Sequence, residues 1–177
     1  IKLQSLSGDI IIQAGADAAF GIQAQGTGDV LLQTRAADGD LVIQAALQSG
    51  AGHLSLLASD DIQLASTLKT SGAGSVYLLA ANATHDASHG IEMTAGAGIQ
   101  TSAGNVRMAA LNQGDIRLTR IDAGNVSLLA ERSILDANAA ELNIVASQLR
   151  MEANTGTIGQ ADPMNGAPDQ NLKAIET

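Results

Sequence analysis

The chain of 177 residues contains no cysteine and no tryptophan, and its only aromatic residues are Phe20 and Tyr77. The absence of cysteine excludes a disulfide scaffold, a thiolate zinc site and a cysteine nucleophile. Because aromatic side chains are so scarce, the apolar 45% of the chain consists almost entirely of alanine, isoleucine, leucine and valine. A core of this chain must therefore be built from small and branched side chains.

Positive charge is also scarce. Nine Lys and Arg residues stand against eighteen Asp and Glu residues, which gives a net charge of −9. Such a charge repels nucleic acids and anionic bilayers on average. No uncharged apolar run reaches the roughly 18 residues that span a bilayer, and no secretion signal is recognisable. We therefore expect no nucleic-acid partner and no membrane span.

A seven-residue phrase recurs along the whole chain. Its first position is Gly and its second is a polar residue. The third is β-branched or Leu, the fifth is Leu, Ile or Met, the seventh is small, and the fourth and sixth can be any residue. Residues 8–14, 28–34 and 124–130 are examples. The apolar residues alternate with a period of two, which indicates a strand with one buried face. The Gly, Asp and Asn residues between copies are typical of turns. Frequent glycine argues against helices.

The first inward residue of successive copies recurs at short intervals along the chain. These residues are Ile10, Ile22, Val30, Leu41, Leu54, Ile62, Val76, Ile91, Ile99, Val106, Ile116, Val126, Ile134, Leu142, Leu149 and Ile158. Repetition of one phrase with inward residues of similar size favours a solenoid over a sandwich or a barrel. The sequence thus predicts an all-β, right-handed parallel β-helix with two or three strands and about 16–24 residues per coil.

The regular spacing of the repeat copies is interrupted in two places. We expect inserted loops near residues 81–89 and near residues 159–170, where both prolines lie. The strand pattern also begins and ends within a coil. We therefore expect residues 1–177 to be a single β-solenoid segment of a larger chain.

Two segments carry a resemblance to a known family. Residues 124–130 (Gly-Asn-Val-Ser-Leu-Leu-Ala) and 153–159 (Ala-Asn-Thr-Gly-Thr-Ile-Gly) resemble the filamentous haemagglutinin-like repeats of large bacterial surface adhesins and exoproteins. The resemblance extends over essentially the whole chain. It implies a right-handed parallel β-helical shaft, secreted to or displayed on the cell surface, with no catalytic residues. The Asn-Pro-Asn-Gly signature of the family's secretion domain is missing, so no export role is expected.

Two groups of residues are candidates for metal binding. His85, Asp86 and His89 have a spacing that could hold a metal on a helix, but they lie in a glycine-bounded segment, so we expect a solvated loop. The aspartates at the turns that open the repeats could stack and bind Ca²⁺; they are Asp9, Asp29, Asp40, Asp61 and Asp115. The Gly-Gly-x-Gly-x-Asp repeat of calcium-binding rolls is absent. We expect these carboxylates to serve as turn residues, with no metal or other cofactor.

Several outward positions suggest other roles. Arg107 and Arg117 are expected at equivalent outward positions, as in carbohydrate-active β-helices, but there are almost no aromatic side chains on which sugars could stack. Ile11, Leu31 and Val42 could form an apolar stripe for a lateral contact, or they could be scattered surface residues. The Asn82 and Asn125 sequons are weak candidates for glycosylation.

The sequence therefore predicts a non-catalytic shaft, acting as a rigid spacer or filament segment of a large secreted bacterial surface protein, most simply an adhesin. The expected location is extracellular or on the bacterial cell surface. The expected partners are adjacent coils of the parent chain or identical subunits stacked end to end, with a host or cell-surface receptor as a further candidate. The alternatives are a carbohydrate-active β-helix enzyme and a self-assembling extracellular fibre subunit.

Overall fold

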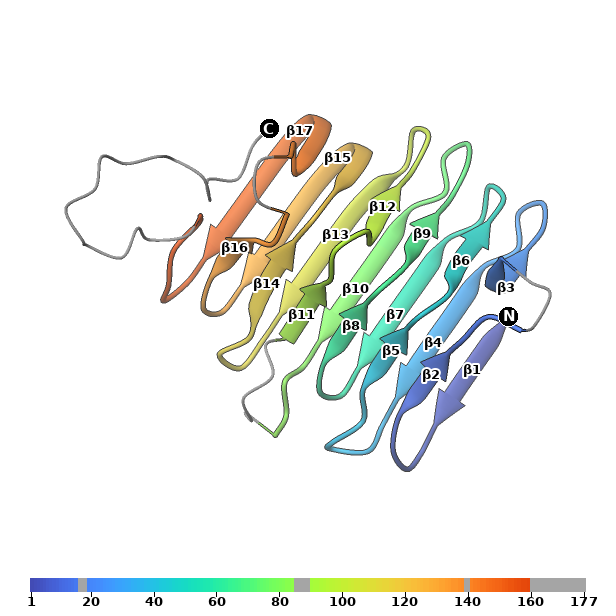
Figure 1. The fold of residues 1–177 in the computed structure, drawn as a ribbon, viewed down its shortest axis with the longest axis horizontal. Coiled ribbons are helices and arrows are strands. Elements are labelled where there is room, and N and C mark those ends of the chain that lie inside the picture. The colour runs from blue at the N-terminus through green and yellow to red at the C-terminus, as the bar shows by residue number, and fades with distance from the viewer. Residues whose placement is uncertain (16–18, 85–89, 139–140, 160–177) are drawn as a thin grey trace.

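The computed structural model describes residues 1–15, 19–84, 90–138 and 141–159. Within these ranges the chain forms seventeen strands and no α-helix. The strands pair in parallel and follow one another along a single stack, from β1 at one end to β17 at the other (Figure 1). The all-β parallel β-helix that the repeats predict is confirmed.

Each coil contributes strands to three faces. The first face contains β1 (Lys2–Ser5), β4 (Val30–Thr34), β7 (Leu54–Ala58), β10 (Val76–Ala80), β13 (Asn105–Ala110) and the later parts of β15 (Ile121–Ala130) and β17 (Ile144–Ala153). The second face contains β2 (Ile10–Ile12), β5 (Leu41–Ile43), β8 (Ile62–Leu64), β11 (Gly90–Met93), β14 (Asp115–Leu118) and β16 (Ile134–Asp136). The third face contains β3 (Phe20–Ala24), β6 (Ala46–Ser49), β9 (Thr67–Lys69), β12 (Gly98–Gln100) and the earlier parts of β15 and β17.

The two longest strands pass from the third face to the first. Ile121 in β15 pairs with Ile99 on the third face, and Val126 in the same strand pairs with Val106 on the first face. The first and third faces are therefore one curled sheet of eleven strands, whereas the second face is a separate sheet of six.

The pairing of equivalent residues shows where each coil begins and ends. Val30 pairs with Leu54, and Leu54 pairs with Val76, so one coil runs from each of these residues to the next. Both of these coils have the expected length. The following coil runs from Val76 to its partner Val106 and is longer than expected, because it contains residues 81–89.

The structure describes only part of the two expected loops. Residues 81–84 lie between β10 and β11 and belong to no strand. Residues 85–89 lie outside the described residues, and so do residues 160–170 of the second expected loop.

The core is a column of aliphatic side chains inside the coils. The predicted inward residues of β4, β7, β10 and β13 are all buried, and those of β5, β8, β11, β14 and β16 are buried in the same way. Because the coils are in register, each side chain stacks on a similar one in the next coil. This stacking explains how a core almost without aromatic residues can be filled.

The expected inward position of Leu142 is wrong. Leu142 is 38% exposed, and Ile144 is buried in its place, paired with Ile121. The side chain of Asn143, between them, is buried and donates hydrogen bonds to the carbonyl oxygen of Thr119 and to Oδ1 of Asp136. This buried amide fixes the chain at the corner, so the strand begins later in the sequence than the spacing predicts.

Two short strands of the third face, β6 and β9, were not recognised from the sequence. β6 and β9 each contain only one fully buried large side chain, Leu47 and Leu68. A single apolar residue cannot display a period of two. These two strands occupy the long gaps that follow Leu41 and Ile62 in the series of inward residues, so a coil has three strands.

A column of glycines lies at the corner between the third and first faces. A Cβ atom on Gly52, Gly74 or Gly104 would collide with the carbonyl oxygen of the preceding glycine in the column, beginning with Gly28. The backbones of neighbouring coils approach so closely here that only glycine fits. The repeated glycine of the sequence phrase is therefore a requirement of stacking as well as of turning.

We predict that Gly104→Ala lowers the free energy of unfolding by about 2 kcal/mol or more, because the new methyl group must push two coils apart. Thermal unfolding should show a melting temperature lower by roughly 4–8 °C. The matched control is Gly15→Ala, where a Cβ meets no atom within 4 Å. Equal effects of the two substitutions would contradict the role of the glycine column.

Candidate functional site: stacked aspartates at the coil corners

A column of polar residues occupies the corner directly before the second face. Asp40 donates its backbone N–H to Oδ1 of Asp9 (2.9 Å), and Asp61 donates its N–H to Oδ1 of Asp40 (3.0 Å). Gly90 in turn donates its N–H to Oδ1 of Asp61 (2.9 Å). Each carboxylate thus binds the equivalent backbone group of the next coil. We call this column the corner ladder.

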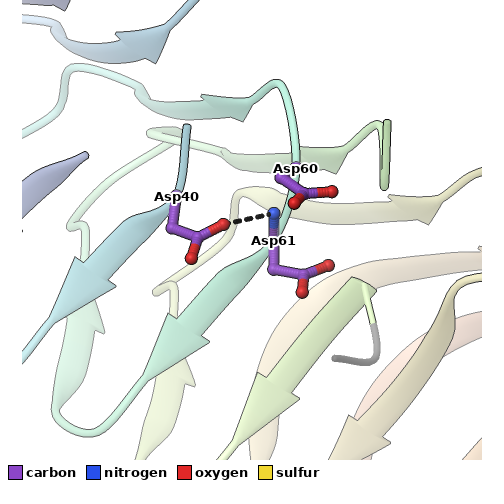
Figure 2. Close-up of side chains that lie close together, drawn as sticks. All are labelled: Asp40, Asp60 and Asp61. Carbon is purple, nitrogen blue, oxygen red and sulfur yellow. Dashed lines mark hydrogen bonds between the residues drawn. The ribbon is translucent and has the colours of Figure 1, made fainter. Parts of the chain in front are cut away.

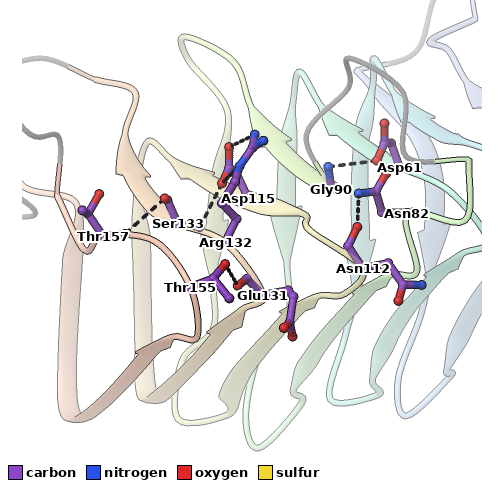
Figure 3. Close-up of polar contacts among 10 residues, drawn as sticks. All are labelled: Asp61, Asn82, Gly90, Asn112, Asp115, Glu131, Arg132, Ser133, Thr155 and Thr157. Atoms are coloured by element: carbon purple, nitrogen blue, oxygen red, sulfur yellow. Dashed lines mark hydrogen bonds and ion pairs between the residues drawn. The ribbon is translucent and has the colours of Figure 1, made fainter.

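The corner ladder is interrupted at Gly90 and resumes in the next coil (Figure 3). Gly90 pairs with Asp115 but has no side chain to offer it. Asp115 Oδ1 accepts the N–H of Ser133 (2.9 Å), and Ser133 Oγ accepts the N–H of Thr157 (3.2 Å). A side chain at Gly90 would be strained, because its φ is +83° and a Cβ would lie 2.9 Å from the Asp115 carbonyl oxygen.

A second ladder runs along the corner before the first face. Asp29 Oδ1 accepts the N–H of His53 (2.8 Å), His53 Nδ1 accepts the N–H of Ser75 (3.1 Å), and Ser75 Oγ accepts the N–H of Asn105 (3.0 Å). Side-chain acceptors of several types therefore fill the same position. These bonds agree with the turn role expected of the repeat aspartates.

Three carboxylates of the corner meet in one cluster. Oxygen atoms of Asp40, Asp60 and Asp61 all lie within 4.8 Å of one another (Figure 2). Asp60 and Asp61 are buried, and Asp40 is half-buried. Asp60 is held by Thr84, whose N–H donates to Oδ1 at 3.1 Å and whose hydroxyl group donates to Oδ2. We call Asp40, Asp60 and Asp61 the acidic cluster.

The acidic cluster makes one of its members a weaker acid. Burial raises the pKa of Asp40 to about 6, and the charges of Asp61, Asp9 and Asp60 act in the same direction. The hydrogen bond from the backbone of Asp61 acts in the opposite direction.

The three carboxylates of the acidic cluster could supply oxygen ligands to a metal ion, or two of them could share a proton. Carboxylates are the ligands that Ca²⁺ and Mg²⁺ prefer, so these are the described residues able to hold a metal ion. A hollow lined by Asp40, Val42, Asp61, Gln63 and Glu92 opens beside them. Asp40 and Asp61 each already bind the backbone of the next coil, however, so the cluster has a structural role that needs no ion.

The other candidate metal ligands, His85, Asp86 and His89, lie outside the described residues. Ile11 and Val42 are neighbours on the second face, and Ile11 is 54% exposed. Leu31 lies on the first face, between Lys2 and Ser55. The three aliphatic residues therefore do not form one stripe, and a lateral contact through them stays a prediction.

The expected equivalence of Arg107 and Arg117 is wrong. Arg107 lies on the first face, where it stacks over the Tyr77 ring at 5.8 Å, whereas Arg117 lies on the second face beside Glu92. The short step in sequence between the two arginines leads to the next face of the same coil and not to the next coil. The two guanidinium groups consequently do not share a surface.

The two sequons differ in accessibility. Asn82 is only 2% exposed, and its amide nitrogen donates to the carbonyl oxygen of Asn112 (2.7 Å). Asn125 is exposed, with its amide nitrogen donating to Asn105 Oδ1 (2.9 Å). A buried and bonded nitrogen is not available for modification in the folded chain, so Asn125 is the more accessible of the two.

Sequence reasoning missed Asp60. Its neighbour Asp61 was identified among the repeat aspartates, and the pair Asp60–Asp61 was visible in the sequence. The approach of Asp40 depends on the pairing of Leu41 with Ile62, which the sequence did not reveal.

Comparison with protein-family models, curated proteins and solved structures gave no match. The described part of the chain contains no helix of the length and hydrophobicity required to cross a membrane.

We predict that the protein becomes more stable as the pH falls from 7.5 to 5. The folded-state pKa of Asp40, about 6, exceeds the unfolded value of 3.8, so the folded state takes up the proton first. The stabilisation is complete near pH 4 and is lost as the pH rises through 6. Thermal unfolding at several pH values should show the melting temperature rising by a few degrees as the pH falls from 7.5 to 5.

Asp40→Asn tests the assignment, because asparagine keeps an oxygen that accepts the Asp61 N–H but cannot ionise. This variant should be more stable than the wild type at pH 7.5 and should lose most of the pH dependence. Asp38→Asn, at an exposed aspartate of the same turn, should keep it. A full pH response in Asp40→Asn would contradict the account.

Proposed function

We propose that the chain is a non-catalytic shaft, a rigid spacer or filament segment, of a large secreted bacterial surface protein. The observation that supports this proposal is the continuous register of the first-face strands. The first inward residue of each first-face strand pairs in turn with the next, through Val30, Leu54, Val76, Val106 and Val126. A structure in which each coil contacts only its neighbours extends along one axis, and its length is set by the number of coils.

The polar residues also fit a structural role. The carboxylates that sequence analysis singled out bind backbone N–H groups of the next coil, so they link coils together. Arg132 adds a further link, since its guanidinium Nε donates to Asp115 Oδ1 (2.9 Å). Removing an acceptor of this kind leaves a backbone donor without its bond. The proposal thus accounts for the aspartates without a substrate.

The surface setting rests on the resemblance to filamentous haemagglutinin-like repeats and on the charge. A net charge of −9 favours solubility and repels anionic bilayers and nucleic acids. We propose an extracellular or cell-surface location and an adhesin as the parent protein. The proposed partners are neighbouring coils of the parent chain or identical subunits, with a receptor contacted elsewhere on the assembly.

A shaft should tolerate the loss of one complete coil. We predict that deletion of residues 54–75 leaves a folded protein, because Val76 can then pair with Val30 and Asp40 can accept the N–H of Gly90. Circular dichroism should remain that of a β protein, and unfolding should remain cooperative. The deletion also removes Asp60 and Asp61.

The matched control is deletion of residues 54–64, about half a coil, which puts the remaining strands out of register and should prevent folding. The wild type and the 54–75 deletion should both leave acidic polysaccharides uncleaved. Cleavage by the wild type that is lost in the deletion would favour a carbohydrate-active enzyme. Unfolding of the whole-coil deletion would contradict a modular stack.

A further inference from the structure

The first face carries an outward row of aliphatic residues. Leu57, Leu79, Ala109 and Leu129 occupy the same position in four successive coils and are paired in register. In each strand they follow a buried core residue, so their side chains point away from the core. Ala109, the smallest of the four, lies between Leu79 and Leu129 in the row and is only 3% exposed. We call these four residues the aliphatic row.

The aliphatic row is unlike the outward positions of the third face. The corresponding residues there are polar or charged in five successive coils, namely Gln23, Gln48, Lys69, Gln100 and Asp122, and the row ends in a single aliphatic residue, Val145. A solvated sheet face normally alternates apolar inward residues with polar outward ones. Four consecutive coils with an aliphatic outward residue therefore indicate a covered surface.

We propose that the aliphatic row is a lateral docking surface for the same face of a second copy of this chain. A two-fold contact requires a self-complementary surface. A two-fold axis parallel to the strands, between β10 and β13, places Leu57 against Leu129 of the second copy and Leu79 against Ala109. Apolar residues of one copy then meet apolar residues of the other along the whole row.

The neighbouring outward row fits the same arrangement. It contains Leu31, Ser55, Tyr77, Arg107, Ser127 and Arg150. The axis places Tyr77 against Arg107 of the second copy, a pairing that already occurs within one chain at 5.8 Å. Arg150 meets Leu31, and Glu152 meets Gln33. No two charges of the same sign face each other, which is the condition for a symmetric contact in a charged molecule.

The size of the face sets the strength of the contact. The axis brings six strands of the first face, from β4 to β17, opposite their equivalents, and six strands of about five residues at ~3.3 Å each, ~4.8 Å apart, give roughly 475 Å² per copy. This area lies at the low end for protein interfaces, so the dimer should be weak. Each copy also carries a net charge of −9. Because salt screens the repulsion between the copies, added salt should strengthen the association.

Analytical ultracentrifugation of the complete chain, from about 10 µM to 1 mM at low and high salt, tests the proposal. The wild type should change from monomer to dimer with concentration, more readily at high salt. Leu79→Glu should abolish the dimer, because it places a carboxylate at the centre of the contact. Gln100→Glu, with the same change of charge on the third face, should leave it unchanged. A wild type that stays monomeric, or equal behaviour of the two variants, overturns the proposal.

A crosslinking experiment covers the case in which Leu79→Glu does not fold. The chain has no cysteine, so an introduced thiol reports only its own contacts. Equimolar Leu79→Cys and Ala109→Cys chains should form a mixed disulfide dimer on oxidation. The pair Gln100→Cys and Ala109→Cys should form far less of it. Equal yields from both mixtures would overturn the proposed arrangement.

Discussion

The rest of the structure depends on the parallel backbone pairing of each coil with the next, in constant register. This pairing determines what each corner and each strand can contain. A glycine is required where neighbouring backbones approach most closely, as at Gly74 and Gly104. A side-chain acceptor is useful where a backbone N–H would lose its partner, as between Asp40 and Asp61. The sequence phrase reflects these two demands, repeated in every coil.

The same constant register also brings acidic side chains of neighbouring coils close together. Because ladder residues are stacked coil upon coil, aspartates in successive coils come close together even though like charges repel. Asp40, Asp60 and Asp61 are one result, and the raised pKa of Asp40 follows from their burial and proximity. At other positions of the corner ladder, a different residue type avoids the repulsion between carboxylates. Gly90 removes the side chain altogether, and Arg132 neutralises Asp115.

Much of the fold could be predicted from the sequence, because a period of two and a recurring glycine are local features. The predicted inward residues from Val30 to Ile134 followed from them, and all of these are buried. Leu47 and Leu68 were not found, since a strand with one buried residue has no detectable period. The composition of the site was harder to predict. Which residues become neighbours depends on the number of strands per coil. With three strands per coil, Arg107 and Arg117 lie on different faces. The same number of strands brings Asp40 close to Asp60 and Asp61.

The most direct test of the account measures distances along one row of the first face. One outward row of that face runs in register from Lys2 to Arg150. Arg150 lies six coils from Lys2, five coils from Leu31 and four coils from Ser55. Pairs of spin labels on introduced cysteines, diluted with unlabelled chain, would give these separations by pulsed electron resonance. Distances from position 150 of about 29, 24 and 19 Å, decreasing in equal steps of ~4.8 Å, are what the registered stack predicts. Distances that do not decrease in equal steps would contradict it.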